Sequence, residues 1–277
     1  MTPTTALLAA STAPSPLWYA TRAGGTVALV LLTATVALGI AVGGRHAPRT
    51  VARFEVTNLH RNLAFLTLVF LALHIVTAVM DSFVHLGWWI TLVPFTSGYR
   101  TLWLGLGTVA FDLLLAVTLT SATAGLRLRI GQRRWKAIHW LAYGSWPIAV
   151  FHAAGTGTDT KDTLQLALYA LCLGVVVLAV WWRLFRAGPG HALVRVAAGA
   201  ATLAVPLALV TFLHVGPLAP GWSHRAEGPA PAAASPLPET TTPGTTTPGT
   251  TTPGTTTPGT ATAALATPPT PTKEATR

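Results

Sequence analysis

Charged residues are scarce in this sequence. Asp, Glu, Lys and Arg make up 9% of its 277 residues, against about 25% in an ordinary soluble domain. The mean hydropathy is +0.53, so too little polar surface remains to cover a soluble fold. The formal net charge of +10 is gathered in clusters between apolar runs, which argues against nucleic-acid binding. Such clusters are typical of the cytoplasmic face of a membrane protein.

Cysteine is almost absent as well. Cys172 is the single one, and it lies inside an apolar run, where it reads as a small packing residue. One cysteine excludes a disulfide framework and a cysteine-based metal site within the chain. A secretory leader is not expected, because residues 1–20 carry no Lys or Arg and the apolar stretch 6–10 is too short. The unusual reservoir of chemistry is histidine, with nine residues.

Six apolar runs approach the roughly 20 residues that a helix needs to cross a bilayer. Backbone groups in lipid must be satisfied within the segment, so runs of this length are expected to be helices. The sequence therefore predicts an all-α integral membrane fold, a bundle of six transmembrane helices. The runs lie near 24–43, 59–80, 101–124, 137–154, 163–182 and 192–215.

The connections between these runs alternate in charge. The second contains Asp81 and Arg100, and the fourth contains Asp159, Lys161 and Asp162, so neither is predominantly basic. The first, third and fifth are basic, with Arg45, Arg49, Arg53 and Arg61, then Arg127, Arg129, Arg133, Arg134 and Lys136, then Arg183, Arg186 and Arg195. The positive-inside rule places the basic connections in the cytoplasm and both termini outside. We therefore expect a multi-pass protein of the cell membrane.

Three domains follow from this layout. Residues 1–23 form an N-terminal extracytoplasmic segment, 24–216 the six-helix membrane domain, and 217–277 an extracytoplasmic tail. Residues 240–259 of the tail are four copies of TTTPG. Such a tract has little apolar surface to bury and is expected to be disordered. It is either a flexible spacer or an O-glycosylated stalk, and the two interpretations are compatible.

Histidines form two pairs with similar spacing. His60 and His74 are 14 residues apart on the second expected helix, and His139 and His152 are 13 apart on the fourth. At about 1.5 Å per residue, each pair spans roughly 20 Å. Both helices follow a basic connection and so run parallel, which pairs His60 with His139 near the inside and His74 with His152 near the outside. Neutral imidazole is a standard axial ligand of haem iron, and facing helices suit such a cofactor. The pattern predicts two haem b groups.

Two alternatives stay open at this point. The histidines could be interfacial residues at helix ends, or partners in hydrogen bonds between helices. The chain could also be a proton or metal transporter that uses these histidines and Asp112. The spacing poses a further problem, because both histidines of a pair should lie on the same face of their helix. At about 100° per residue, a step of 14 residues returns to within about 40° of the starting face, whereas a step of 13 residues misses it by about 140°. Pro147 should bend the fourth helix, but a bend alone does not provide that rotation.

The paired spacings, with HWLAYGSWPIAVFH spanning the second pair, resemble the ferric reductase-like transmembrane domain family. That family includes ferric reductases, NADPH oxidases and the haem-binding membrane subunit of a bacterial methionine sulfoxide reductase system. The stretch DSFVHLGWWITLVPFTSGYRTLWLGLGTVAFDLLL resembles the bacterial branch. The resemblance covers about residues 20–216. It implies bis-histidine haem b at the four named positions and outward electron transfer to an acceptor such as ferric iron or a redox partner protein.

The sequence departs from ferric reductases and NADPH oxidases in one respect. Those proteins continue into a cytoplasmic flavin- and NADPH-binding domain, and no G-x-G-x-x-G between a strand and a helix is found here. We therefore expect no flavin site within the chain, and an oxidoreductase component that receives electrons from quinol or from a separate flavoprotein. The expected partners are the lipid bilayer, this donor and an extracytoplasmic acceptor, without nucleic acid.

Five further residues are candidates around the haems. Asp112, midway along the third helix, is expected either to bond a ligand imidazole or to form a structural hydrogen bond. Arg133, Arg134 and Lys136 precede His139 and could pair with the propionates of the inner haem, although their role in topology already explains them. Arg100 could do the same for the outer haem.

Overall fold

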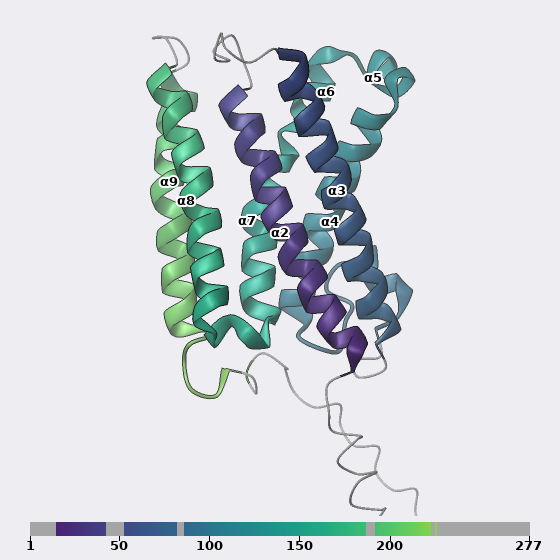
Figure 1. Ribbon diagram of the computed structural model, residues 1–277, viewed down its shortest axis with the longest axis vertical. Helices are drawn as coiled ribbons and strands as arrows, with labels where there is room; N and C mark the ends of the chain where they lie inside the picture. Colours follow the sequence, from purple (N-terminus) through teal and green to yellow (C-terminus); the bar gives the residue numbers. More distant parts are fainter. Residues whose placement is uncertain (1–14, 43–52, 82–85, 187–191, 223–224, 226–277) are drawn as a thin grey trace, which may run out of the picture. The chain divides into compact units, whose positions relative to one another are not determined.

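The computed structural model describes residues 15–42, 53–81, 86–186, 192–222 and 225 (Figure 1). Within these residues the chain is helical and contains no strand. Five helices are long and apolar enough to cross a membrane. They are α2 (Pro16–Val42), α3 (Arg53–Met80), α4 (Thr101–Ala122), α8 (Thr163–Arg186) and α9 (Ala192–Val215). Residues 1–14, Arg45, Arg49 and the TTTPG repeats of the expected tail lie outside the described residues.

Helix α2 begins at Pro16, well before the apolar run that predicted it. Ser15 accepts a hydrogen bond from the Trp18 backbone N–H on its Oγ, at 3.0 Å, so it caps the first turn. Ser at the cap and Pro at the first helical position are a strong start signal. The sequence analysis placed the start of the run at residue 24, after the charged Arg22. The expected N-terminal segment 1–23 therefore includes the first turns of α2.

The fourth expected helix is divided into α6 (Gln132–His139) and α7 (Leu141–Thr156). The division lies at Trp140, whose N–H bonds to the carbonyls of Lys136 and Ala137 at 3.1 and 3.2 Å. The Tyr143 N–H then bonds to the Trp140 carbonyl at 3.0 Å, a tightened turn of the 3₁₀ type. Pro147 lies inside α7, which continues past it. The predicted continuous helix over 137–154 is therefore wrong. In the part of the chain that the structure describes, five helices rather than six have the length of a span.

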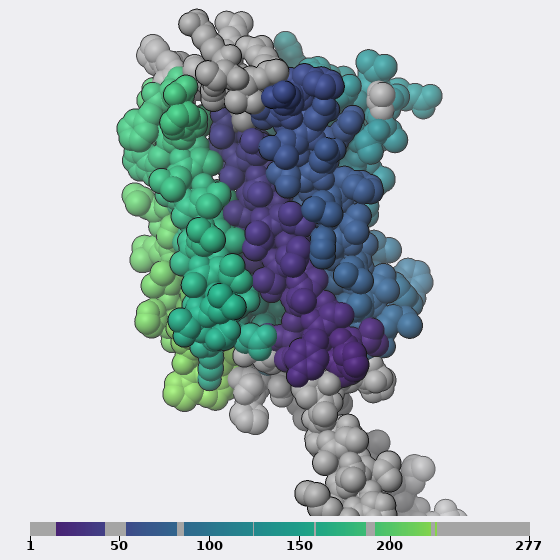
Figure 2. All heavy atoms as spheres, in the orientation of Figure 1, coloured from purple at the N-terminus to yellow at the C-terminus, as the bar shows by residue number. Residues whose placement is uncertain are grey.

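Helix α2 lies between its neighbours: it packs on α3, on α8 and on α7, while α4 packs on α7. Figure 2 shows α2 running between α3 and α8 on one face of the bundle. The buried core joins apolar side chains of α2, α7, α8 and α9: Leu29, Leu32, Val36, Ile40, Trp146, Val150, Ala154, Tyr169, Cys172 and Leu209. Cys172 is thus a buried packing residue, as the sequence suggested.

The remaining elements are short and lie at the two ends of the bundle. Helix α5 (Ala124–Ile130) and α6 are at the end where α3 begins, and η1 (Trp88–Thr91) and η2 (Thr158–Lys161) are at the other. Helices α3 and α7 consequently run in the same direction (Figure 1). Many apolar side chains of α3 and α9 point outward, among them Phe65 and Leu203, at 69% and 71% exposed. Outward apolar surface of this kind suits contact with lipid.

Candidate functional site

Two pairs of imidazoles lie inside the bundle. The first pair is His60 of α3 with His139 of α6, whose ring centroids are 6.4 Å apart. The second pair is His74 of α3 with His152 of α7, at 6.3 Å. The structure therefore brings together the same partners that the sequence spacing indicates. His139 ends α6 and His152 belongs to α7, so the two residues are not on one continuous helix. The rule of about 100° per residue therefore does not apply across Trp140, and a spacing of 13 residues is compatible with both side chains facing α3.

These separations can be tested against an iron atom placed between the rings. A bond from a metal to an imidazole nitrogen is about 2.0–2.1 Å long, and the ring centre lies about 1 Å further. Two imidazoles on opposite sides of one metal ion therefore have centroids roughly 6 Å apart. Both pairs meet this requirement. Within the described residues, no group of three or more His, Cys, Asp or Glu side chains forms a metal cluster.

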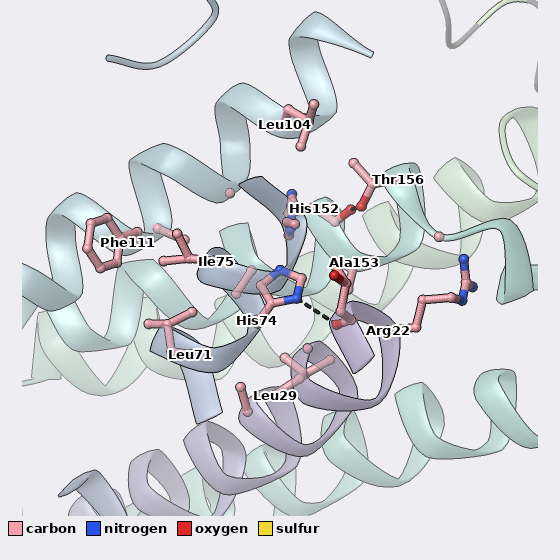
Figure 3. Close-up of a pocket in the computed structure, with 18 of the residues that line it drawn as sticks. Arg22, Leu29, Leu71, His74, Ile75, Leu104, Phe111, His152, Ala153 and Thr156 are labelled. Atoms are coloured by element: carbon pink, nitrogen blue, oxygen red, sulfur yellow. Dashed lines mark hydrogen bonds between the residues drawn. The ribbon is translucent and has the colours of Figure 1, made fainter. Parts of the chain in front are cut away.

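The second pair opens into a cavity of about 330 Å³. Figure 3 shows the rings of His74 and His152 close together, with Leu71, Ile75 and Phe111 beside them. Apolar side chains thus form much of the wall, and polar residues such as Asp81, Tyr99 and Gln165 also line it. A mainly apolar wall with a few polar groups is typical of cofactor sites.

The second ring nitrogen of each histidine in this pair bonds to a helix backbone. His74 donates from Nδ1 to the Thr21 carbonyl of α2, and His152 donates from Nδ1 to the Trp103 carbonyl of α4, both at 2.8 Å. A carbonyl can only accept, so Nδ1 carries the proton and Nε2 retains its lone pair. Metal-bound histidines are commonly oriented in this way. The residues that carry these carbonyls have no side-chain signature of their own, so the spacing of the histidines alone does not reveal them.

The first pair has a different environment. The Nδ1 atoms of His60 and His139 are buried and make no aligned hydrogen bond with any described residue. The Trp135 ring stacks on His139, with centroids 5.2 Å apart and planes at 29°. Its indole N–H points to Ser121 Oγ at 3.4 Å. Aromatic packing rather than a backbone bond therefore orients His139.

Glycines lie directly against three of the four histidines, and sequence reasoning missed them. A Cβ atom on Gly25 would come within 2.8 Å of His74 Nδ1, and one on Gly107 within 2.5 Å of His152 Nδ1. A Cβ atom on Gly39 would lie 3.3 Å from His60 Cε1. The signal was available, since Gly25 and Gly39 are 14 residues apart, as are His60 and His74.

Arg100 belongs to a helix junction. Its side chain is 2% exposed, and its Nη1 donates to the Gly155 and Thr156 carbonyls at 3.3 and 3.0 Å. These are carbonyls at the C-terminal end of α7, where a positive charge is favourable. Arg100 also starts α4 with a left-handed φ of 43°. The structure thus gives this residue, expected near a propionate, a role in holding α4 to α7.

The other expected residues are placed as follows. Asp112 is half-buried in α4 and is not among the residues that line the cavity around the second pair. Arg133, Arg134 and Lys136 are exposed on α6, the helix that ends at His139.

Arg22 was missed by the sequence analysis. It forms an ion pair with Asp159 of η2 and lies over the Trp18 ring at 4.5 Å. It lines the cavity of the second pair, although its side chain extends away from both imidazoles in Figure 3.

Long apolar helices around two imidazole pairs are typical of a multi-pass membrane protein. The chain is 26% identical, over 170 residues, to the protein-methionine-sulfoxide reductase heme-binding subunit MsrQ of Ralstonia nicotianae (strain ATCC BAA-1114 / GMI1000). The match covers 61% of this chain and 73% of that protein. No family model matches the chain, and no solved structure matches it. The relative supports the resemblance drawn from the histidine spacing, at the level of a haem-binding membrane subunit.

Proposed function

We propose that this protein is a membrane electron-transfer subunit that holds two b-type haems, one at each imidazole pair. The observation that carries the proposal is the matching centroid separation of 6.4 and 6.3 Å in two separate pairs. A single close pair could be a chance hydrogen-bonded contact between helices. Two pairs with the separation that a metal ion requires are difficult to explain in that way. The similarity to a heme-binding subunit supports the same assignment.

Each histidine would bind iron through Nε2, and a haem b held there would take up and release single electrons. The bonds from Nδ1 of His74 and His152 hold those rings in one tautomer. The mainly apolar wall around the second pair suits the apolar ring of such a cofactor. Near the first pair, Arg133, Arg134 and Lys136 are the proposed partners of the propionates. At the second pair Arg22 joins Arg100 as a candidate.

The proposed topology has six crossings, with residues 24–216 forming the membrane domain. The fourth crossing consists of α6 and α7 together, because α7 alone has 16 residues and spans about 24 Å at 1.5 Å per residue. The alternating charge of the connections supports extracytoplasmic termini. Electrons then enter near His60 and His139, from quinol or a cytoplasmic flavoprotein, and leave near His74 and His152. The acceptor outside is ferric iron or a redox partner protein.

The test is the haem content of the protein purified in detergent. We expect two b-type haems per chain by pyridine haemochrome analysis, and a low-spin reduced-minus-oxidised spectrum. A folded, colourless preparation that cannot be reconstituted with haem would overturn the proposal. If that preparation bound a divalent cation or carried protons in vesicles, the histidines and Asp112 would belong to a transporter instead.

A further inference from the structure

The two histidines of the second pair meet their helices in the same way. His74 bonds to the carbonyl of Thr21, and the residue four positions later in α2 is Gly25. His152 bonds to the carbonyl of Trp103, and the residue four positions later in α4 is Gly107. In a regular helix, a carbonyl accepts a hydrogen bond from the N–H of the residue four positions later. For both carbonyls that bind an imidazole here, that later residue is a glycine.

This spacing has a physical reason. The Cα–Cβ bond of a helical residue tilts toward the N-terminus, so its side chain covers the turn before it. A glycine leaves the carbonyl four residues earlier open from the side. That oxygen has a second lone pair, which can accept the imidazole N–H while the helical bond persists. An alanine would instead place Cβ 2.8 Å from His74 Nδ1, or 2.5 Å from His152 Nδ1, the very atoms that make these bonds.

A third, looser copy occurs at the first pair. Gly39 follows Thr35 by four residues in α2, and the backbone of Thr35 interacts with the His60 imidazole. A Cβ atom on Gly39 would lie 3.3 Å from His60 Cε1. Here Nδ1 is not aligned for a hydrogen bond with a described residue. Gly25 and Gly39 are 14 residues apart in α2, so the corresponding partner of Gly107 in α4 would be residue 121. That residue is Ser121, which contacts Trp135. The fourth histidine, His139, thus has an aromatic neighbour where the others have a glycine.

We propose that Gly25, Gly39 and Gly107 are positioning residues for the haem-ligand histidines. Each opens a helix carbonyl, or the space beside it, to one imidazole, and at the second pair the carbonyl fixes the orientation and tautomer of the ring. The inference rests on the proposed function, since it concerns histidines that bind iron. An N–H bond to a carbonyl raises the basicity of the ligand, which favours the ferric state. Loss of the bond should therefore raise the midpoint potential of the haem at that pair.

The experiment compares glycine-to-alanine variants of the full chain. Gly25→Ala and Gly107→Ala should lose the haem of the second pair, or shift its absorption and raise its midpoint potential, and should leave the other haem unchanged. Gly39→Ala should produce a smaller change, confined to the haem of the first pair. Gly24→Ala is the matched control, because its Cβ would lie at an ordinary 3.5 Å from the His74 backbone. Gly174→Ala is a second control, with no atom within 4 Å of its Cβ.

The outcomes separate the inference from the function. A wild-type protein without haem refutes the proposed function. A wild-type protein with two haems, whose Gly25→Ala and Gly107→Ala variants keep both spectra and both potentials, refutes only the role of the glycines. If these variants do not accumulate, NMR of dithionite-reduced wild-type protein labelled with ¹⁵N-histidine decides. Two Nδ1–H resonances with strong downfield shifts support the inference, and their absence overturns it.

Discussion

His74 and His152 bond to backbone carbonyls through Nδ1, whereas the same atoms of His60 and His139 have no aligned partner among the described residues. The spacing of the histidines in the sequence was enough to pair them correctly in space. It did not reveal what the second ring nitrogen touches, because every residue has a carbonyl and the spacing of the histidines does not select one of them. For the same reason the charge of Arg100 suggested a propionate, but it could not show that the side chain also donates to the carbonyls of Gly155 and Thr156.

Removing one histidine should affect one haem. We expect His60→Ala or His139→Ala to abolish the low-spin signal of the first haem, and His74→Ala or His152→Ala that of the second. An iron with a single axial ligand becomes five-coordinate or is lost, which halves the low-spin content. Redox-titrated absorption spectra and electron paramagnetic resonance measure this change.

The matched control is His214→Ala, because His214 lies in the last turn of α9 and belongs to neither pair. It should retain both haems. Full low-spin content for two haems in each of the four single variants would show that the assignment of ligands is wrong.

Among the helices, α2, α3, α4, α8 and α9 follow the apolar runs, so their existence could be read from the sequence. Their ends could not, because helices extend past the apolar window until a cap or a turn stops them, as Ser15 shows. The division of α6 from α7 was also hidden. Residues 137–154 are continuously apolar enough to predict one span, and Pro147 was the expected point of distortion. The tightened turn instead lies at Trp140, because local backbone bonding rather than hydropathy decides it.

A buried hydrogen bond links α7 to α2. The Trp146 indole N–H donates to Thr33 Oγ1 at 2.9 Å, and both side chains are buried. We predict that Thr33→Val lowers stability by about 1 kcal/mol, since polar contacts between membrane helices contribute about 0.6–2 kcal/mol and the indole N–H would lose its acceptor. Thermal unfolding in detergent, followed by near-ultraviolet circular dichroism, measures the effect.

The Trp146→Phe background provides the control for this bond. There Thr33→Val should have little effect, because the donor is already gone, and the double-mutant cycle isolates the interaction. An equal loss of stability in both backgrounds would show that the bond contributes nothing.

At the scale of the whole chain, the described helices and both imidazole pairs belong to one unit, Met1–Pro231. We predict that deleting residues 239–277 leaves the haem content and the spectrum unchanged, because this stretch of the sequence contains no histidine. Haem per chain in the purified truncated protein is the measurement. A truncated protein that expresses normally but holds no haem would contradict this.

The direction of electron transfer across the membrane can be tested in proteoliposomes that carry an impermeant ferric acceptor on one side. NADPH alone should not reduce the protein in stopped-flow measurements, whereas a quinol analogue or an added flavoprotein should. The acceptor should be reduced from the side that carries Asp159 and Asp162. Rapid haem reduction by NADPH alone would contradict the expected need for a separate donor. Acceptor reduction only from the side of α5 and α6 would reverse the direction.

The division at Trp140 also bears on how long each cofactor would remain bound. His139 belongs to α6, which has 8 residues, and helices shorter than about 12 residues are marginal by themselves. His152 belongs to the longer α7 and is tied to α4 by its backbone bond. Local opening of α6 can withdraw His139 while the long helices stay packed. The two sites should therefore differ in residence time, with exchange of haem faster at His60 and His139 than at His74 and His152.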